Sequence, residues 1–64
     1  MQTAIVVVGT QKPELFLVTV TDLDQHMQAG EFREFIGSTY PRELANWIAQ
    51  QEGERRTLPV ILAA

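Results

Sequence analysis

The sequence predicts an α+β fold: a small two-layer mini-domain in which one main helix packs on a β-sheet. Three observations predict it: paired β-branched runs in the first third, one long segment with helical spacing, and an extended apolar run near the C-terminus. A chain of 64 residues is long enough for one domain with a thin core. We therefore expect residues 1–64 to form a single domain with an N-terminal antiparallel β-hairpin and a C-terminal strand.

The hairpin is predicted from two extended segments joined by a turn. Residues 3–8 are apolar and mostly β-branched, which is typical of a strand covered on at least one face. Residues 9–14 contain a glycine and a proline and suit a turn, and residues 15–21 resume the extended pattern. Because side chains alternate along a strand, the apolar face that carries Phe16 and Val20 should face the core.

The middle of the chain is predicted to be mainly helical. Thr21 and Asp24 have the spacing of a helix N-cap and an acidic third residue, and Gly30 is a natural terminator of a helix of about two turns. Residues 31–36 fit either period, but helical spacing gathers both phenylalanines and the isoleucine into the cleaner apolar stripe. We favour helical or irregular structure there, ended by Gly37.

The principal helix is predicted to follow Pro41. Proline suits the first turn of a helix because the N–H groups there have no partner within the helix, so the lack of one costs nothing. Gly53 is expected to end this helix. Large apolar residues recur at spacings of four, three and one and should pack on the sheet, with the tryptophan in the core: Tyr40, Leu44, Trp47 and Ile48.

A final strand is predicted over residues 58–62. Pro59 lies within this run and cannot donate to a β-ladder, so the strand should lie at an edge of the sheet or carry a bulge. Either strand of the hairpin is a possible partner, and no local feature decides between them.

Composition limits the classes of partner and cofactor. The chain has no cysteine, so neither a disulfide framework nor a thiolate zinc site reinforces the small core. Its apolar runs are much shorter than the roughly 20 residues that span a bilayer, and its N-terminus lacks a basic signal region. An isoelectric point near 4.8 disfavours direct binding of nucleic acid, which depends on clustered lysine and arginine. We expect a cytoplasmic protein without membrane association.

The formal net charge of −3 arises entirely between Asp22 and Gly37. This segment holds four carboxylates against one arginine, and it also holds two of the three phenylalanines. A local negative field around aromatic rings is typical of a protein contact surface. We therefore predict a partner-binding site made of Asp22, Asp24, Glu31, Phe32, Glu34 and Phe35.

A non-enzymatic interaction protein is the function that this surface favours, with a larger protein that has a basic surface as its partner. Basic surfaces often hold nucleic acid, so carboxylates presented in place of phosphates would make the chain a competitive inhibitor. In size and charge the chain is similar to small inhibitors encoded by phages and mobile elements, including anti-CRISPR proteins. This resemblance includes no motif, so no family follows from it.

Two other classes of protein stay open. A homo-oligomer would enlarge the core by pairing a second copy along a sheet edge, either at Pro59 or at the hairpin. A small metal-dependent enzyme would use Asp22, Asp24 and His26, although a helix would turn Asp24 away from the other two. With one histidine and no cysteine, the sequence supports no nucleophilic mechanism, so no catalytic residue, metal or cofactor is assigned.

Overall fold

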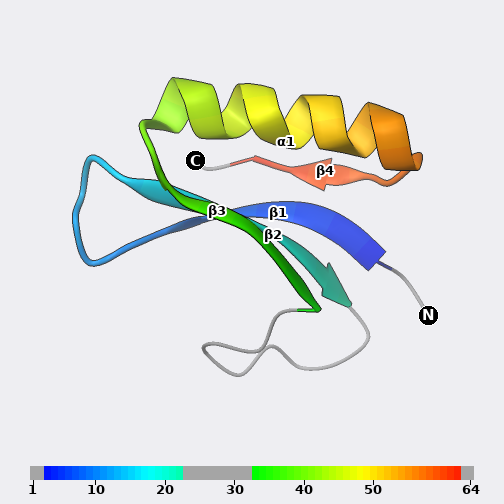
Figure 1. The fold of residues 1–64 in the computed structure, drawn as a ribbon, viewed down its shortest axis with the longest axis horizontal. Helices are drawn as coiled ribbons and strands as arrows, with labels where there is room; N and C mark the ends of the chain where they lie inside the picture. The colour runs from blue at the N-terminus through cyan, green and yellow to red at the C-terminus, as the bar shows by residue number, and fades with distance from the viewer. Residues whose placement is uncertain (1–2, 23–32, 63–64) are drawn as a thin grey trace.

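A four-stranded mixed sheet with one helix laid across one face forms the fold of the chain (Figure 1). The computed structural model describes residues 3–22 and 33–62. The predicted α+β fold, with its N-terminal hairpin, main helix and C-terminal strand, is confirmed. In chain order the elements are β1 (Thr3–Gly9), β2 (Phe16–Asp22), β3 (Glu34–Tyr40), α1 (Arg42–Arg56) and β4 (Val60–Ile61).

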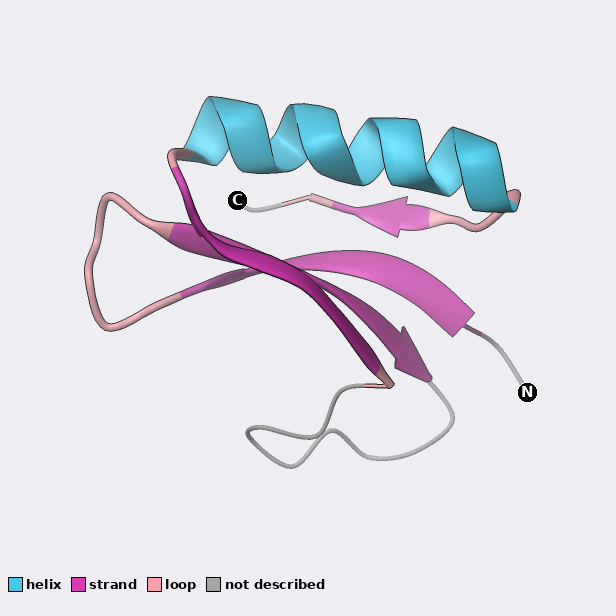
Figure 2. Cartoon of the chain, viewed as in Figure 1, coloured by secondary structure: helices cyan, strands magenta, loops and turns pink. Residues whose placement is uncertain are grey.

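The strands follow the order β3-β2-β1-β4, with the hairpin at the centre of the sheet (Figure 2). β1 pairs antiparallel with β2 along its whole length, and β3 adds antiparallel to the other side of β2. β4 pairs in parallel with β1, with Ile5 opposite Val60 and Val6 opposite Ile61. This identifies the partner that the sequence left open, and β4 is an edge strand, as Pro59 predicted. The strand is shorter than the predicted residues 58–62, because it spans only Val60–Ile61 and Pro59 lies just before it.

The core lies between α1 and the sheet. Phe16 and Val20 of β2 are buried on the face covered by the helix, as the alternation predicted. The helix contributes only small buried side chains to this cluster, so its backbone can lie close to the sheet. The buried apolar cluster consists of Ile5, Val7, Phe16, Val18, Val20, Ala45 and Ala49.

The opposite face of the sheet is also buried at several positions and carries a small polar network. Thr19 and Thr21 are almost fully buried, with 3.0 Å between their hydroxyl oxygens. Thr19 Oγ1 also donates to the carbonyl oxygen of Val6 at 3.3 Å. Among the described residues every buried side-chain nitrogen or oxygen has a hydrogen-bond partner. The two threonine hydroxyls are therefore buried without the energetic cost of an unsatisfied polar group.

α1 faces the sheet with small residues, which corrects the predicted helix stripe. Leu44 and Trp47 were expected in the core, but their exposed fractions are 43% and 58%. The buried stripe is instead Ala45, Ala49 and Gly53, spaced four residues apart. The prediction was wrong for Leu44 and Trp47, because the close approach of helix and sheet buries small residues at the centre of the contact, whereas Tyr40 and Ile48 are half-buried and pack against the core as predicted.

The end of α1 also differs from the prediction, because the helix continues past Gly53 to Arg56. Gly53 is buried where α1 approaches β4. A Cβ atom at this position would collide with Cγ2 of Val60 and would lie 3.0 Å from the carbonyl oxygen of Leu58. The glycine therefore serves the packing of the helix against the edge strand and does not end the helix.

β3 (Glu34–Tyr40) corrects the prediction for the middle of the chain. The sequence favoured helical or irregular structure up to Gly37, but these residues belong to an extended strand. The pairing of β3 with β2 shifts register twice, and each shift interrupts the alternation that identifies a strand. The strand was missed for this reason. The short helix predicted with Thr21 as its N-cap does not begin there, because β2 continues through Asp22. The rest of that predicted helix falls within residues 23–32, which lie outside the described part of the chain.

Candidate functional site

Asp22, the first residue of the predicted contact site, ends β2 and is engaged within the fold. Its Oδ1 atom accepts a hydrogen bond from the Thr3 hydroxyl at 2.8 Å and another from the Arg33 guanidinium at 3.1 Å. The Thr3 hydroxyl, followed by Arg33, lowers the pKa of the Asp22 carboxyl below its usual value. The carboxylate of Asp22 is therefore already hydrogen-bonded to two donors within the fold.

Glu34, at the start of β3, forms an ion pair with Arg56 at the end of α1. Nη2 of Arg56 donates to Oε2 at 2.6 Å, and Nη1 donates to Oε1 at 3.2 Å. This two-point geometry is the strong form of an arginine–carboxylate contact. The hydrogen bond from Arg56 is the main cause that lowers the pKa of the Glu34 carboxyl.

Glu52 extends this contact into a cluster on the side of α1 that faces β3. Arg55 donates to both of its carboxylate oxygens, at 2.6 and 3.1 Å, and Arg56 donates from Nε to Oε1 at 3.0 Å. Hydrogen bonds from Arg55 and then Arg56 lower the pKa of Glu52 despite an opposing effect of burial. We call Glu34, Glu52, Arg55 and Arg56 the arginine–glutamate cluster.

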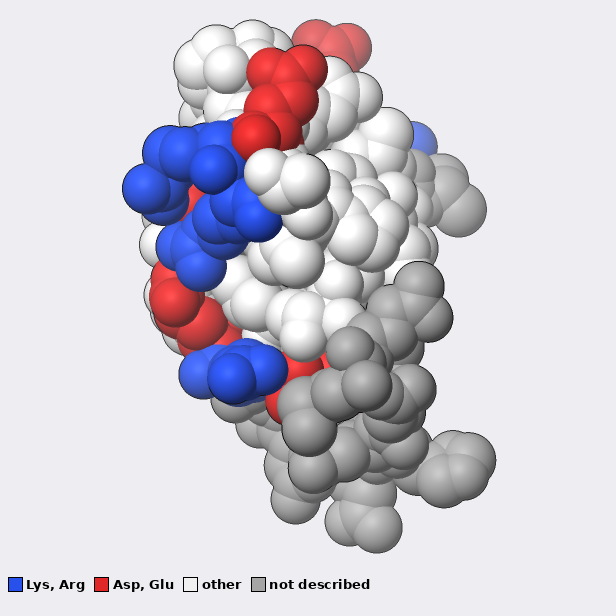
Figure 3. Space-filling view, turned by 90° about the vertical axis from the view of Figure 1, so that its right-hand side faces the viewer, with Lys and Arg blue, Asp and Glu red and all other residues white. Residues whose placement is uncertain are grey.

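Charges of opposite sign are in contact along this side of the molecule (Figure 3). The arginine–glutamate cluster holds two carboxylates and two guanidinium groups, so its formal charge is zero. Asp22 and Arg33 form a second neutral pair at 3.1 Å. The local excess of acid that the sequence predicted between Asp22 and Gly37 is therefore compensated at its two described carboxylates.

The predicted contact site is described only in part. Phe35 of β3 is 55% exposed, as a contact residue would be, and lies opposite Thr19 of β2. Asp22 and Glu34 are both described, and each is held by an arginine. Three other predicted members, Asp24, Glu31 and Phe32, lie outside the described residues, so the site as a whole stays a prediction.

A surface that the sequence reasoning missed lies on the side of α1 turned away from the sheet. Trp47 is at its centre, and Leu44 lies one turn before it. Glu43 and Glu54 are four residues before and seven residues after Trp47, which places both carboxylates on the same side of the helix. We call these four exposed residues the α1 outer face. The signal that could have revealed it is the spacing of the small residues that α1 buries.

The basic side chains of α1 contact an aromatic ring or glutamate carboxylates. The guanidinium carbon of Arg42 lies 5.3 Å from the centre of the Phe16 ring. Arg55 and Arg56 belong to the arginine–glutamate cluster. By contrast, neither Glu43 nor Glu54 forms an ion pair with a described residue, so the α1 outer face combines an exposed aromatic centre with uncompensated acid.

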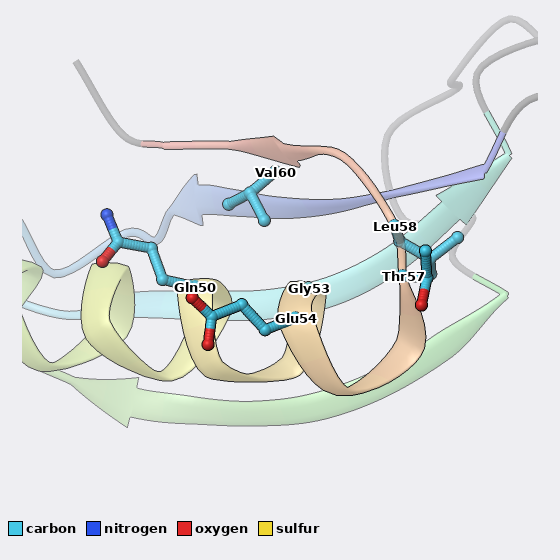
Figure 4. Close-up of a pocket in the computed structure, with 6 residues that line it drawn as sticks. All are labelled: Gln50, Gly53, Glu54, Thr57, Leu58 and Val60. Carbon is cyan, nitrogen blue, oxygen red and sulfur yellow. The ribbon is translucent and has the colours of Figure 1, made fainter.

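An open groove is lined by the C-terminal half of α1 and by β4 with the residues before it, two elements that pack closely at Gly53 and Val60 (Figure 4). Its volume is about 590 Å³. In Figure 4 the side chain of Val60 points from β4 toward the helix, and the polar ends of Gln50 and Glu54 lie on the helix side. The groove thus has an apolar floor and a polar rim, lined by Gln50, Gly53, Glu54, Thr57, Leu58 and Val60.

The alternative of a metal site is not tested by the described residues. Asp24 and His26 both lie outside them, and only Asp22 of the proposed ligand set is described. Within residues 3–22 and 33–62, no group of three or more histidine, cysteine, aspartate and glutamate side chains is placed to hold a metal ion. The metal-dependent enzyme therefore stays a prediction.

Comparisons with protein-family models, with curated proteins and with solved structures find no match to this chain. None of the described helices has the length and apolar character needed to cross a membrane. The exposed surfaces of the fold are therefore the guide to its function.

Proposed function

We propose that this chain is a non-enzymatic protein-binding module that docks on the basic surface of a larger protein and inhibits that protein by occupying the surface. The observation that carries the proposal is the exposure of Trp47 in the middle of α1, next to exposed Leu44. Tryptophan is among the residues that contribute most binding energy when a partner buries them. An exposed tryptophan on a helix that is already packed on a sheet supplies such an anchor at little cost in conformational entropy.

Charge on the α1 outer face favours a basic partner. Glu43 and Glu54 flank Trp47 and are not neutralised by a described residue, whereas Arg55 and Arg56 are held in ion pairs with Glu52 and Glu34. Carboxylates around an aromatic anchor are complementary to lysine and arginine, and they speed the encounter with a basic surface. Where that surface normally holds nucleic acid, bound carboxylates would replace phosphates and block it.

The site predicted from the sequence enters this proposal as a second contact. Phe35 supplies an exposed ring on β3. Asp22 and Glu34 keep their arginine partners in this arrangement, so they contribute hydrogen-bonding positions but little net charge. The two contacts are separable, because one is centred on a strand and the other on the helix.

The proposal is tested by capturing partners from a host lysate with four single variants arranged as matched pairs. Trp47→Ser is compared with Phe35→Ser, and Glu43→Lys with Glu14→Lys, which makes the same charge change on the β1–β2 turn. We expect capture of the inhibited partner to fail with Trp47→Ser and Glu43→Lys and to persist with Glu14→Lys. Capture should also weaken as salt is raised, because exposed charges are screened.

The result for Phe35→Ser measures the second contact separately. If all four variants capture the same partners with the same salt sensitivity, the α1 outer face is not the binding surface. The inhibitory part of the proposal requires a further measurement on the captured partner. Its binding of a nucleic-acid probe should fall when wild-type chain is added and should be unaffected by Trp47→Ser.

A further inference from the structure

We propose that the groove between α1 and β4 is a second binding site, which takes an extended peptide segment with apolar and basic side chains as an additional strand beside β4. This goes beyond the proposed docking of the α1 outer face, since it uses the edge of β4 and main-chain recognition and shares only Glu54 with that face. Peptides bind sheet edges in this way through backbone hydrogen bonds, while pockets for alternate side chains select the sequence.

The outer edge of β4 presents backbone groups to such a segment. Ile5 of β1 donates its amide to the carbonyl oxygen of Pro59 at 2.9 Å. In a parallel ladder this places the backbone groups of residue 59 and residue 61 toward β1, so the N–H and C=O groups of Val60 and Leu62 point away from it. No described strand lies on that side of β4.

Pro59 does not block this edge. Its missing N–H belongs to a position that faces β1, so the outward-facing donors are those of Val60 and Leu62. Ile61 and Leu62 are 46% and 41% exposed, and neither carries a charge that would repel an added strand. The edge therefore lacks the charged side chains with which sheets prevent pairing.

The groove supplies the side-chain selectivity. Side chains of an added strand that point toward α1 would enter the groove beside Val60 and Leu58, which are apolar. The next such position along the strand would reach the polar rim at Gln50 and Glu54. A segment with one apolar residue and one basic residue, separated by a single residue, fits both environments.

Charge at the groove favours the basic residue and disfavours a second copy of this chain. Glu54 forms no ion pair with a described residue, and the C-terminal end of α1 adds partial negative charge. A second copy paired through β4 would present another groove whose lining has no basic residue, so it would offer no charge complementary to Glu54. A basic peptide is the complementary occupant.

The test is a selection from a phage-displayed library of random dodecapeptides against the immobilised chain, followed by affinity measurements on the enriched peptides. We expect enriched peptides to contain an apolar residue two positions from a lysine or arginine. Leu62→Pro removes one outward N–H group and should weaken binding about fivefold to tenfold, whereas Leu62→Ala keeps that group and should bind more tightly than Leu62→Pro. Glu54→Gln should weaken binding roughly threefold.

Backbone amide shifts in NMR spectra locate the bound peptide. Changes at Val60, Ile61 and Leu62, retained in the Trp47→Ser variant, would support the groove independently of the α1 outer face. Three results would overturn the proposal: no enriched peptide, equal binding by Leu62→Pro and Leu62→Ala, or shifts confined to the α1 outer face. A dimer seen by sedimentation and abolished by Leu62→Pro would also overturn it, because the occupant would then be a second copy.

Discussion

Arg56, in the last turn of α1, holds the carboxylate of Glu34 at the start of β3 through two hydrogen bonds, the shorter of which measures 2.6 Å. The two residues are 22 positions apart, so the contact connects the end of the helix to β3, one of the two edge strands of the sheet. Because Arg56 also donates to Glu52, one guanidinium connects both carboxylates of the arginine–glutamate cluster. The cluster should therefore respond to pH as a unit.

Acid should destabilise the fold through these carboxylates. The pKa values of Asp22, Glu34 and Glu52 are all lowered by hydrogen bonds from hydroxyl or guanidinium groups. A lowered pKa in the folded state adds stability above the pKa of the unfolded chain, and this stability is lost as the pH falls through the folded value. We expect the melting temperature to decrease between about pH 5 and about pH 2.

The Arg56→Gln variant tests how much of the loss of stability in acid is due to the arginine–glutamate cluster. This variant removes the main partner of Glu34, so its melting temperature should depend less on pH over the same range. Lys12→Gln is the matched control, since it removes one positive charge from a side chain that pairs with no described carboxylate. Identical pH profiles for wild type, Arg56→Gln and Lys12→Gln would contradict a stabilising role of the cluster.

Trp47→Ser should leave the stability of the fold nearly unchanged. Substitutions at exposed sites usually change the free energy of unfolding by less than about 0.5 kcal/mol, whereas truncating a buried tryptophan costs about 3–5 kcal/mol. Urea unfolding of the variant, followed by circular dichroism, distinguishes these values. Acrylamide should quench the fluorescence of this single tryptophan in the folded protein almost as strongly as in urea. Strong protection from the quencher would contradict its exposure.

The hairpin could be predicted because its information is local. β1 is a mostly β-branched apolar run, β2 alternates to give one apolar face, and the register between them has no irregularity. Pro59 likewise indicated an edge strand without knowledge of the partner, although its missing N–H lies at a position that faces β1 and not on the open edge. The parallel pairing of β4 with β1 depends instead on the position at which the chain leaves α1 beside the sheet, and no local sequence pattern predicts that position.

The α1 outer face could not be predicted by hydrophobicity alone. Leu44 and Trp47 lie at helical spacing, and so does the buried stripe of Ala45, Ala49 and Gly53, so the helix has two candidate inner faces. Large apolar side chains usually lie inside, and the prediction followed that rule. The tertiary packing reverses it, because α1 approaches the sheet too closely for the larger stripe.

The site predicted between Asp22 and Phe35 depended on charge counted along the chain. That count treats neighbouring carboxylates as one field, but the partner of Glu34 comes from α1 and its distance along the sequence hides it. Arg33, by contrast, is close to Asp22 in the chain and was already included in the count. Long-range ion pairs are therefore the part of a surface that sequence composition predicts least well.

Gly53→Ala should destabilise the fold, although alanine is the better helix former. In an exposed helix this change would add about 1 kcal/mol to the free energy of unfolding. Here the new Cβ would collide with Val60 and press on the carbonyl of Leu58, so we expect a net loss of about 1–3 kcal/mol, measured by urea unfolding. Gln51→Ala on the exposed side of α1 is the control and should be neutral or slightly stabilising. A more stable Gly53→Ala variant would contradict the close packing of α1 on β4.

Thr57→Gly should stabilise the fold, because Thr57 is a β-branched residue in the left-handed region, with φ 56° and ψ 49°. Its amide and that of Leu58 bond to the carbonyl oxygens of Glu54 and Gly53 at 3.3 and 2.9 Å, the pattern of a Schellman motif that glycine normally completes. Relief of backbone strain exceeds the entropy that glycine adds to the unfolded chain, so we expect a gain of about 1 kcal/mol in urea unfolding. Thr57→Ala retains a Cβ atom and should gain less. Equal stability of the glycine and alanine variants would show that the Cβ atom carries no strain at this position.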